Sequence, residues 1–226
     1  MSGPSPPVAA RVAVVRARIA RAAARAGRDP SEVTLVAATK NVAPARVQEV
    51  VDAGVPDLGE NRAQELLTKT AVTGVPPLVV RWHFLGQLQR NKVRALAPWV
   101  ACWESVDRPE LGAEIARRAP GARVLVEVNL GEEPQKGGCL PAQVPALVDD
   151  LRAVGLDVTG LMAVPPHADE PRRWFAALRD QGAVLGLPEL SMGMTDDFEV
   201  AVEEGATIVR VGRALFGPRP GPPRPG

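Results

Sequence analysis

Tyrosine is absent from this chain of 226 residues, and cysteine and histidine each occur only twice. Mechanisms that need a tyrosine as acid, base or nucleophile are therefore excluded. Neither Cys102 nor Cys139 lies in a spacing typical of a metal site, so we expect no bound metal. Because no secretory signal is recognisable, we expect a cytoplasmic protein whose two thiols need not form a disulfide.

The chain also lacks an excess of charge of either sign, and it lacks long apolar runs. Its formal net charge is +1 at pH 7, with acidic and basic residues interspersed. Nucleic-acid and membrane surfaces need concentrated positive charge, so we expect neither partner. No run approaches the roughly 20 apolar residues that a membrane-spanning helix requires. A monomer is the expected state.

Short apolar runs alternate with helical patterns along most of the chain. A strand followed by a helix, repeated with short links, is typical of parallel βα units. Several runs are continuously apolar, as in strands that are covered on both faces. Eight strands in one domain predict a single (β/α)8 TIM-type barrel. We expect strands at 33–39, 57–59, 81–86, 100–105, 123–130, 158–164, 189–192 and 207–212, with helices at 43–53, 60–70, 89–96, 108–118, 141–153, 168–182 and 196–204.

The N-terminal segment 8–26 allows two interpretations. It is rich in arginine and free of acidic residues, which resembles a mitochondrial targeting helix. Its valines and Ile19 recur at helical spacing, which predicts an extra helix packed on the barrel, and its low serine content favours this second interpretation. Residues 1–7 and 217–226 are rich in proline and glycine and are expected to be flexible tails, so the domain should span 8–216.

Lys40 directly follows the first apolar run, Val33-Thr-Leu-Val-Ala-Ala-Thr39. By strand parity it shares a face with Val36 and Ala38. An amine at the mouth of an apolar strand is partly desolvated, which favours the neutral form that can condense with an aldehyde. The alternative is a side chain that extends past the strand end into solvent.

Arg210 lies inside the last apolar run, Thr207-Ile-Val-Arg-Val211. A buried cation is costly without a partner. Either it forms an ion pair with a barrel carboxylate such as Glu60 or Glu127, or it binds an acceptor on a ligand.

A short helix is predicted from Arg213 to Phe216, directly after Gly212. The backbone N–H groups at such a helix start bind phosphate well, and barrels often hold a phosphate between the loops that follow strands seven and eight. Ser191, at the end of the seventh strand, is placed to add a hydroxyl from the neighbouring loop.

Two other polar positions have structural explanations. His83 is expected to be a packed, hydrogen-bonded core histidine rather than a catalytic base. Asn61 suits a cap for the helix that is expected to begin nearby.

Six segments together resemble the pyridoxal phosphate homeostasis protein family. They occur in the family's order between about residues 33 and 217, which is nearly the whole folded body, so chance agreement is excluded. The segments are Val36-Ala-Ala-Thr-Lys40, Leu58-Gly-Glu-Asn-Arg-Ala-Gln-Glu65, Trp82-His-Phe-Leu-Gly-Gln-Leu-Gln-Arg-Asn-Lys92, Gly160-Leu-Met-Ala-Val164, Leu190-Ser-Met-Gly-Met-Thr-Asp-Asp197 and Val209-Arg-Val-Gly212.

This resemblance implies a cofactor, pyridoxal 5′-phosphate (PLP), and a role in managing it. The family resembles the barrel half of fold-type III PLP enzymes such as alanine racemase, without their second β domain. It implies intracellular PLP homeostasis, in which the protein buffers the cofactor or delivers it to apo-enzymes. The implied cofactor residues are Lys40 as the Schiff-base lysine, Arg210 facing the pyridine nitrogen, Asn61 lining the ring, and Ser191, Gly212 and Arg213 around the phosphate.

Two positions depart from the family pattern, and two other functions compete with it. Position 62 is Arg where tyrosine is common, and position 213 is Arg where threonine is usual, which leaves only the backbone role of Arg213 intact.

One rival function is that of a PLP-dependent amino-acid racemase or lyase; the other is that of a Schiff-base aldolase without a cofactor. Racemases of this fold type pair their lysine with a tyrosine, which this chain lacks, and an arginine at the pyridine nitrogen weakens the ring as an electron sink.

Overall fold

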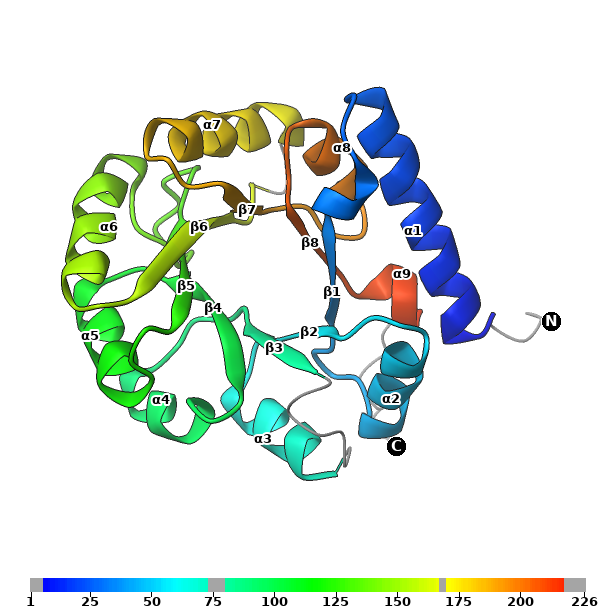
Figure 1. The fold of residues 1–226 in the computed structure, drawn as a ribbon, viewed down its shortest axis with the longest axis horizontal. Coiled ribbons are helices and arrows are strands. Elements are labelled where there is room, and N and C mark those ends of the chain that lie inside the picture. Colours follow the sequence, from blue (N-terminus) through cyan, green and yellow to red (C-terminus); the bar gives the residue numbers. More distant parts are fainter. Residues whose placement is uncertain (1–5, 73–79, 167–169, 218–226) are drawn as a thin grey trace.

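The computed structural model describes residues 6–72, 80–166 and 170–217, and its strands form a closed parallel barrel in chain order (Figure 1). The last strand closes the ring against the first, with Val36 paired to Arg210. The predicted (β/α)8 barrel is therefore confirmed. Its strands are β1 (Thr34–Ala38), β2 (Asp57–Glu60), β3 (Arg81–Phe84), β4 (Val100–Val106), β5 (Arg123–Val128), β6 (Asp157–Ala163), β7 (Glu189–Ser191) and β8 (Ile208–Val211).

Helices cover the outside of the ring of strands (Figure 1). Short 3-10 turns at Pro30–Glu32 and Pro141–Gln143 precede β1 and α6. The helices are α1 (Val8–Arg25), α2 (Pro44–Asp52), α3 (Ala63–Val72), α4 (Arg90–Leu96), α5 (Pro109–Arg118), α6 (Val144–Ala153), α7 (Pro171–Val184), α8 (Phe198–Glu203) and α9 (Arg213–Phe216).

Most observed bounds lie within two residues of the predicted ones, and the start of α3 is the instructive exception. A helix from residue 60 was wrong, because Glu60 completes β2 and pairs there with Phe84. Helix α3 begins only at Ala63. Part of the expected helix 168–182, and most of both expected tails, lie outside the described residues.

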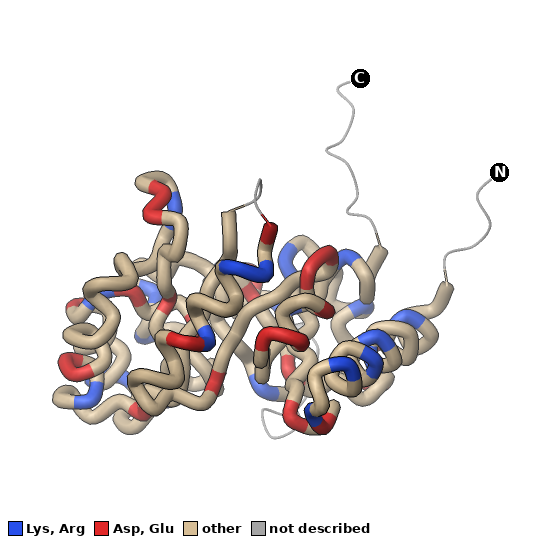
Figure 2. Tube along the Cα trace, turned by 90° about the horizontal axis from the view of Figure 1, so that it is seen from above, with Lys and Arg blue, Asp and Glu red and all other residues tan. Residues whose placement is uncertain are grey.

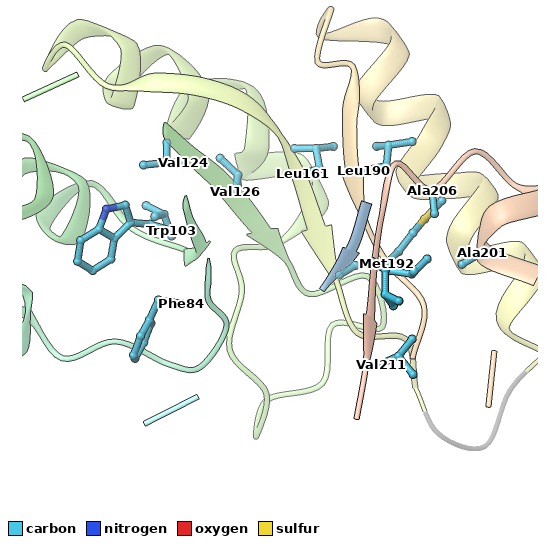
Figure 3. Close-up of a cluster of buried hydrophobic side chains, with 14 of the residues drawn as sticks. Phe84, Trp103, Val124, Val126, Leu161, Leu190, Met192, Ala201, Ala206 and Val211 are labelled. Atoms are coloured by element: carbon cyan, nitrogen blue, oxygen red, sulfur yellow. The ribbon is translucent and has the colours of Figure 1, made fainter. Parts of the chain in front are cut away.

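The core has an inner and an outer layer. A small cluster fills the inside of the barrel: Val36, Cys102, Leu125, Met162 and Ile208. The larger layer packs between strands and helices, where Phe84 and Trp103 lie with ring centroids 6.4 Å apart (Figure 3). Alternate residues along each strand therefore face one layer or the other, which decides which polar side chains can meet inside the barrel.

Helix α1 packs on the barrel, as its apolar periodicity predicted. Val12, Val15 and Ile19 are buried, and the helix contacts α2, α8 and α9. Two of its arginines, which form part of the row of basic positions in Figure 2, pair with acids of α8: Arg18 lies 2.7 Å from Glu199 and Arg25 lies 2.7 Å from Glu203. Among the described residues, we find no helix with the length and apolar character of a membrane span.

The packing of α1 makes a direct stability prediction. Ile19→Ala should lower the free energy of unfolding by about 2–5 kcal/mol, and Ile19→Val by about 0.5–1.5 kcal/mol, because each deletes buried methyl groups in proportion. Urea unfolding followed by circular dichroism measures both. Equal stability of the alanine variant and the wild type would show that α1 is not part of the folded body.

Candidate functional site at the barrel mouth

Polar side chains gather where the strands end at one mouth of the barrel, the place where such barrels carry their active groups. Lys40 is partly buried and lies two residues beyond β1. The end of β1, two residues before Lys40, lies against the start of α9, since a β-carbon added at Gly212 would be 3.2 Å from the carbonyl oxygen of Ala38. Among the described residues, none forms an ion pair or side-chain hydrogen bond with the Lys40 amine, which leaves it available to a ligand.

Arg210 points into the barrel and is held there by three strands. It is 5% exposed; its Nη1 donates to Ser191 Oγ at 2.5 Å and its Nη2 to the carbonyl oxygen of Ala163 at 2.9 Å. Glu104 Oε2 lies 4.0 Å from Nη1. The alternative of an ion pair with a barrel carboxylate is therefore confirmed, but the carboxylate belongs to Glu104 on β4 and not to Glu60 or Glu127. The Glu60 side chain pairs with Lys69 instead.

A chain of alternating charges continues from Arg210 through the barrel interior. Glu104 accepts hydrogen bonds of 2.5 Å from Ser191 Oγ and from His83 Nδ1. The His83 Nε2 atom lies 3.3 Å from Asp57 Oδ1, and Asp57 in turn pairs with Arg81. His83 is therefore the buried, hydrogen-bonded core histidine that the sequence predicted.

This arrangement explains the pKa shifts of the buried groups. Burial opposes charge on His83, but its hydrogen bonds with Asp57 and Glu104 raise its pKa well above the ordinary value. Burial likewise opposes charge on Glu104, yet the His83 hydrogen bond and the His83 and Arg210 charges hold its pKa below the ordinary value. Both groups are therefore charged at neutral pH, and each stabilises the other.

Three buried side chains of the interior are close enough together to be considered as metal ligands, although the sequence predicted no metal site. Donor atoms of His83, Cys102 and Glu104 all lie within 4.8 Å of one another. The His83–Glu104 hydrogen bond uses two of these donors, so a metal ion would have to displace it. The absence of a metal site stays a prediction.

The loop after β7 and the start of α9 form the other side of the mouth. Thr195 Oγ1 accepts a hydrogen bond of 3.3 Å from the backbone amide of Ala214, in the first turn of α9. The Arg213 guanidinium points to Asp196, 2.5 Å from Oδ1, and is largely exposed. The first amides of a helix have no acceptor within the helix, so this corner presents donors and one hydroxyl.

The structure separates the two hydroxyl groups of the segment Ser191–Thr195. Ser191 is fully buried and its hydroxyl bridges Arg210 and Glu104. Thr195, which the sequence analysis did not single out, has its hydroxyl beside α9 instead. The missed signal was its position four residues after Ser191, beyond the turn at Gly193, where φ is 90°.

The remaining predicted residue, Asn61, lies in the loop between β2 and α3. Its backbone amide donates to Glu60 Oε1 at 2.7 Å. Its carbonyl lies so close to Gly86 that a β-carbon there would be 2.1 Å away, which explains the glycine. Arg62, one of the two departures from the family pattern, is exposed and pairs with Glu65 at 3.1 Å.

The interior charges make the next prediction. Glu104→Ala should lower the free energy of unfolding by about 3–5 kcal/mol, because Arg210 then remains buried without its counter-charge and His83 loses one of its two carboxylate partners. Glu49→Ala, which removes an exposed partner of Arg46, should change stability little. Urea titration of both variants compares them. A Glu104 variant as stable as the Glu49 variant would mean that the interior network contributes nothing to folding.

Comparisons with known proteins agree with this architecture. The alanine racemase N-terminal domain family matches residues 11–220. The pyridoxal phosphate homeostasis protein of Aquifex aeolicus is 42% identical over 223 residues, covering 92% of this chain and 97% of that protein. The structure of PipY from Synechococcus elongatus with PLP bound is 34% identical, with a TM-score of 0.81, and covers 93% of this chain and all of that one.

A more distant structure shows the shared fold alone. Alanine racemase from Corynebacterium glutamicum is 16% identical with a TM-score of 0.68, and the match covers 93% of this chain but only 62% of that enzyme. The barrel is thus common to both groups, while the relative that is 42% identical over nearly its full length is a pyridoxal phosphate homeostasis protein. The chain belongs to the pyridoxal phosphate homeostasis protein family, within the larger group that shares the alanine racemase N-terminal domain.

Proposed function

We propose that this protein binds PLP reversibly as a Schiff base on Lys40 and serves intracellular PLP homeostasis, buffering the cofactor or delivering it to apo-enzymes. The observation that carries the proposal is the unpaired Lys40 amine at a mouth that it shares with Arg210 and the start of α9. A relative that is 42% identical is named for this role, and a neighbour that is 34% identical binds PLP.

The groups at the mouth fit the chemistry of PLP. The cofactor supplies an aldehyde that condenses with an amine, and a ring that withdraws electrons. Lys40 offers the amine, Arg210 a donor for the pyridine nitrogen, and the backbone at Gly212 and Arg213 donors for the phosphate. Thr195 offers a hydroxyl at the same corner. Asn61, in the loop after β2, is proposed to line the ring.

The interior network favours a carrier over an enzyme. Because Ser191 and the carbonyl oxygen of Ala163 hold the guanidinium of Arg210, that side chain cannot turn away from the mouth without breaking two hydrogen bonds. A guanidinium opposite the pyridine nitrogen disfavours protonation of the ring, and an unprotonated ring stabilises a carbanion poorly. The lack of tyrosine removes the usual second acid of the racemases.

One observation favours the rival racemase or lyase. Burial, together with the nearby Asp107 charge, raises the pKa of Glu127 to about 7, while Arg210 opposes the shift. A carboxylate that titrates near neutral pH suits acid–base chemistry. The other candidates do not: burial raises the pKa of Cys139 to about 12, and His83 is held between two carboxylates.

We further propose a monomer in the cytoplasm, with apo PLP-dependent enzymes as partners. Both cysteines are free and buried, which is consistent with a reducing compartment. The near-neutral formal charge supports neither a nucleic-acid nor a membrane partner.

The lysine assignment can be tested by trapping. Borohydride reduction of the PLP-loaded protein should fix a phosphopyridoxyl group on the peptide that contains Lys40, and mass spectrometry locates it. Lys40→Ala should lose the imine absorbance and remain folded, because the residue lies beyond the end of β1. Lys92→Ala, at an exposed site, is the matched control and should keep the absorbance. A label on Lys69, Lys92 or Lys136 with Lys40 free would refute the assignment.

The phosphate assignment can be tested by comparing the two hydroxyl groups. If Thr195 contacts the phosphate, Thr195→Val should weaken PLP binding about tenfold or more, since one charge-assisted hydrogen bond contributes about 1.5–3 kcal/mol. It should leave the affinity for pyridoxal, which has no phosphate, unchanged. Titration followed by imine absorbance measures both affinities. If Ser191 contacts the phosphate instead, as the sequence predicted, Ser191→Ala will show this selective loss and Thr195→Val will not.

A further inference from the structure

A second lysine, Lys69 on α3, lies buried directly behind Lys40. Its side chain is 4% exposed, and its ammonium donates to the carbonyl oxygen of Thr39 at 2.6 Å. It also forms a short ion pair with Glu60 at the end of β2 and lies 3.4 Å from Glu65 Oε2. The Thr39 carbonyl belongs to the peptide unit that precedes Lys40, so Lys69 holds the backbone on that side.

Glu65 holds the backbone on the other side of Lys40. Its Oε2 accepts a 2.8 Å hydrogen bond from the amide of Asn41, the peptide unit that follows Lys40. Asn41 has a φ of 61°, in the left-handed region, which asparagine adopts more readily than most residues with a side chain. The Glu65 hydrogen bond to its amide helps to fix this conformation. The Asn41 amide and the Lys69 charge outweigh the effect of burial and hold the pKa of Glu65 below its ordinary value.

Stability alone does not account for this cluster. A buried ion pair is often no more stabilising than apolar residues of the same size, because desolvation cancels the Coulomb attraction. The cluster also reaches the next loop: Thr39 Oγ1 lies 3.0 Å from Glu60 Oε2, and Glu60 Oε1 accepts the amide of Asn61. Its contacts therefore converge on the two segments that present Lys40 and Asn61 to the mouth.

We propose that Lys69, Glu60 and Glu65 form an ionic clamp that fixes both peptide units of Lys40 and so sets the direction in which its amine enters the barrel mouth. They are positioning residues, and this inference rests on the proposed role of Lys40. When the amine nitrogen adds to an aldehyde carbon, a C=N bond forms and the carbonyl oxygen leaves as water. A fixed amine reaches the geometry for that addition without first being ordered, so the clamp speeds condensation.

Glu65 is the residue to change, because it is partly exposed and its loss leaves Lys69 paired with Glu60. Glu65→Ala removes the acceptor for Asn41, whereas Glu65→Gln keeps an acceptor oxygen and is the matched control. Stopped-flow absorbance measures imine formation when apo-protein is mixed with PLP. We expect Glu65→Ala to be at least about tenfold slower than wild type and Glu65→Gln to be close to it. Glu65→Met, of similar length and without the acceptor, replaces the alanine variant if that variant is unstable.

A second ligand separates positioning from a general structural effect. Pyridoxine 5′-phosphate has an alcohol in place of the aldehyde, so its affinity, measured by calorimetry, reports the rest of the site. The clamp predicts unchanged affinity for it in Glu65→Ala. A wild-type rate of imine formation in that variant, or an equal loss of both readouts, overturns the clamp. Imine formation that persists in Lys40→Ala would instead refute the proposed function, whatever the Glu65 variants do.

Discussion

A cation buried inside the barrel, Arg210, constrains much of the interior around it. Taking a guanidinium out of water is costly, so the barrel must supply acceptors and a counter-charge at that point. Ala163, Ser191 and Glu104, from three different strands, supply them. Glu104 is itself a buried charge, and it is balanced by His83, which lies between Glu104 and Asp57. Each buried polar residue of the interior thus compensates the charge of its neighbour, beginning with the need to neutralise Arg210.

Side chains on the two faces of the strands have different roles at the site. Side chains that point inward form the charge network and the floor of the mouth around Arg210. Side chains that point outward, such as Thr39 and Glu60, meet Lys69 and hold the backbone from behind. Lys40 lies just past the end of β1, where both systems meet. A rigid scaffold of this kind can present an amine, a guanidinium and helix-start amides in fixed relation to one ligand.

The sequence alone predicted the barrel, its strand order and the mouth where polar residues gather, because hydrophobic periodicity and short links depend on local sequence. It did not identify Glu104, whose partners come from β3, β7 and β8, because contacts between distant strands leave no local pattern.

Two other features were missed for the same reason. Thr195 was overlooked beside Ser191, since only the turn at Gly193 shows that the two hydroxyl groups lie in different places. Lys69 was not singled out from the sequence, because its burial depends on the position of Glu60 at the end of β2. The sequence therefore predicted the secondary structure, but it did not predict which charged residues far apart in the chain lie together.

We propose that this protein carries PLP without turning over an amino acid. Proton exchange at Cα tests it most directly: the PLP-loaded protein is incubated with L- or D-alanine in deuterated water and followed by proton NMR. The proposed place of Arg210 opposite the ring nitrogen, together with the lack of tyrosine, predicts negligible loss of the Cα–H signal. Exchange at rates ordinary for enzymes, about 1 s⁻¹ or more, would contradict the claim, and loss of that exchange in Glu127→Gln would identify the acid–base group.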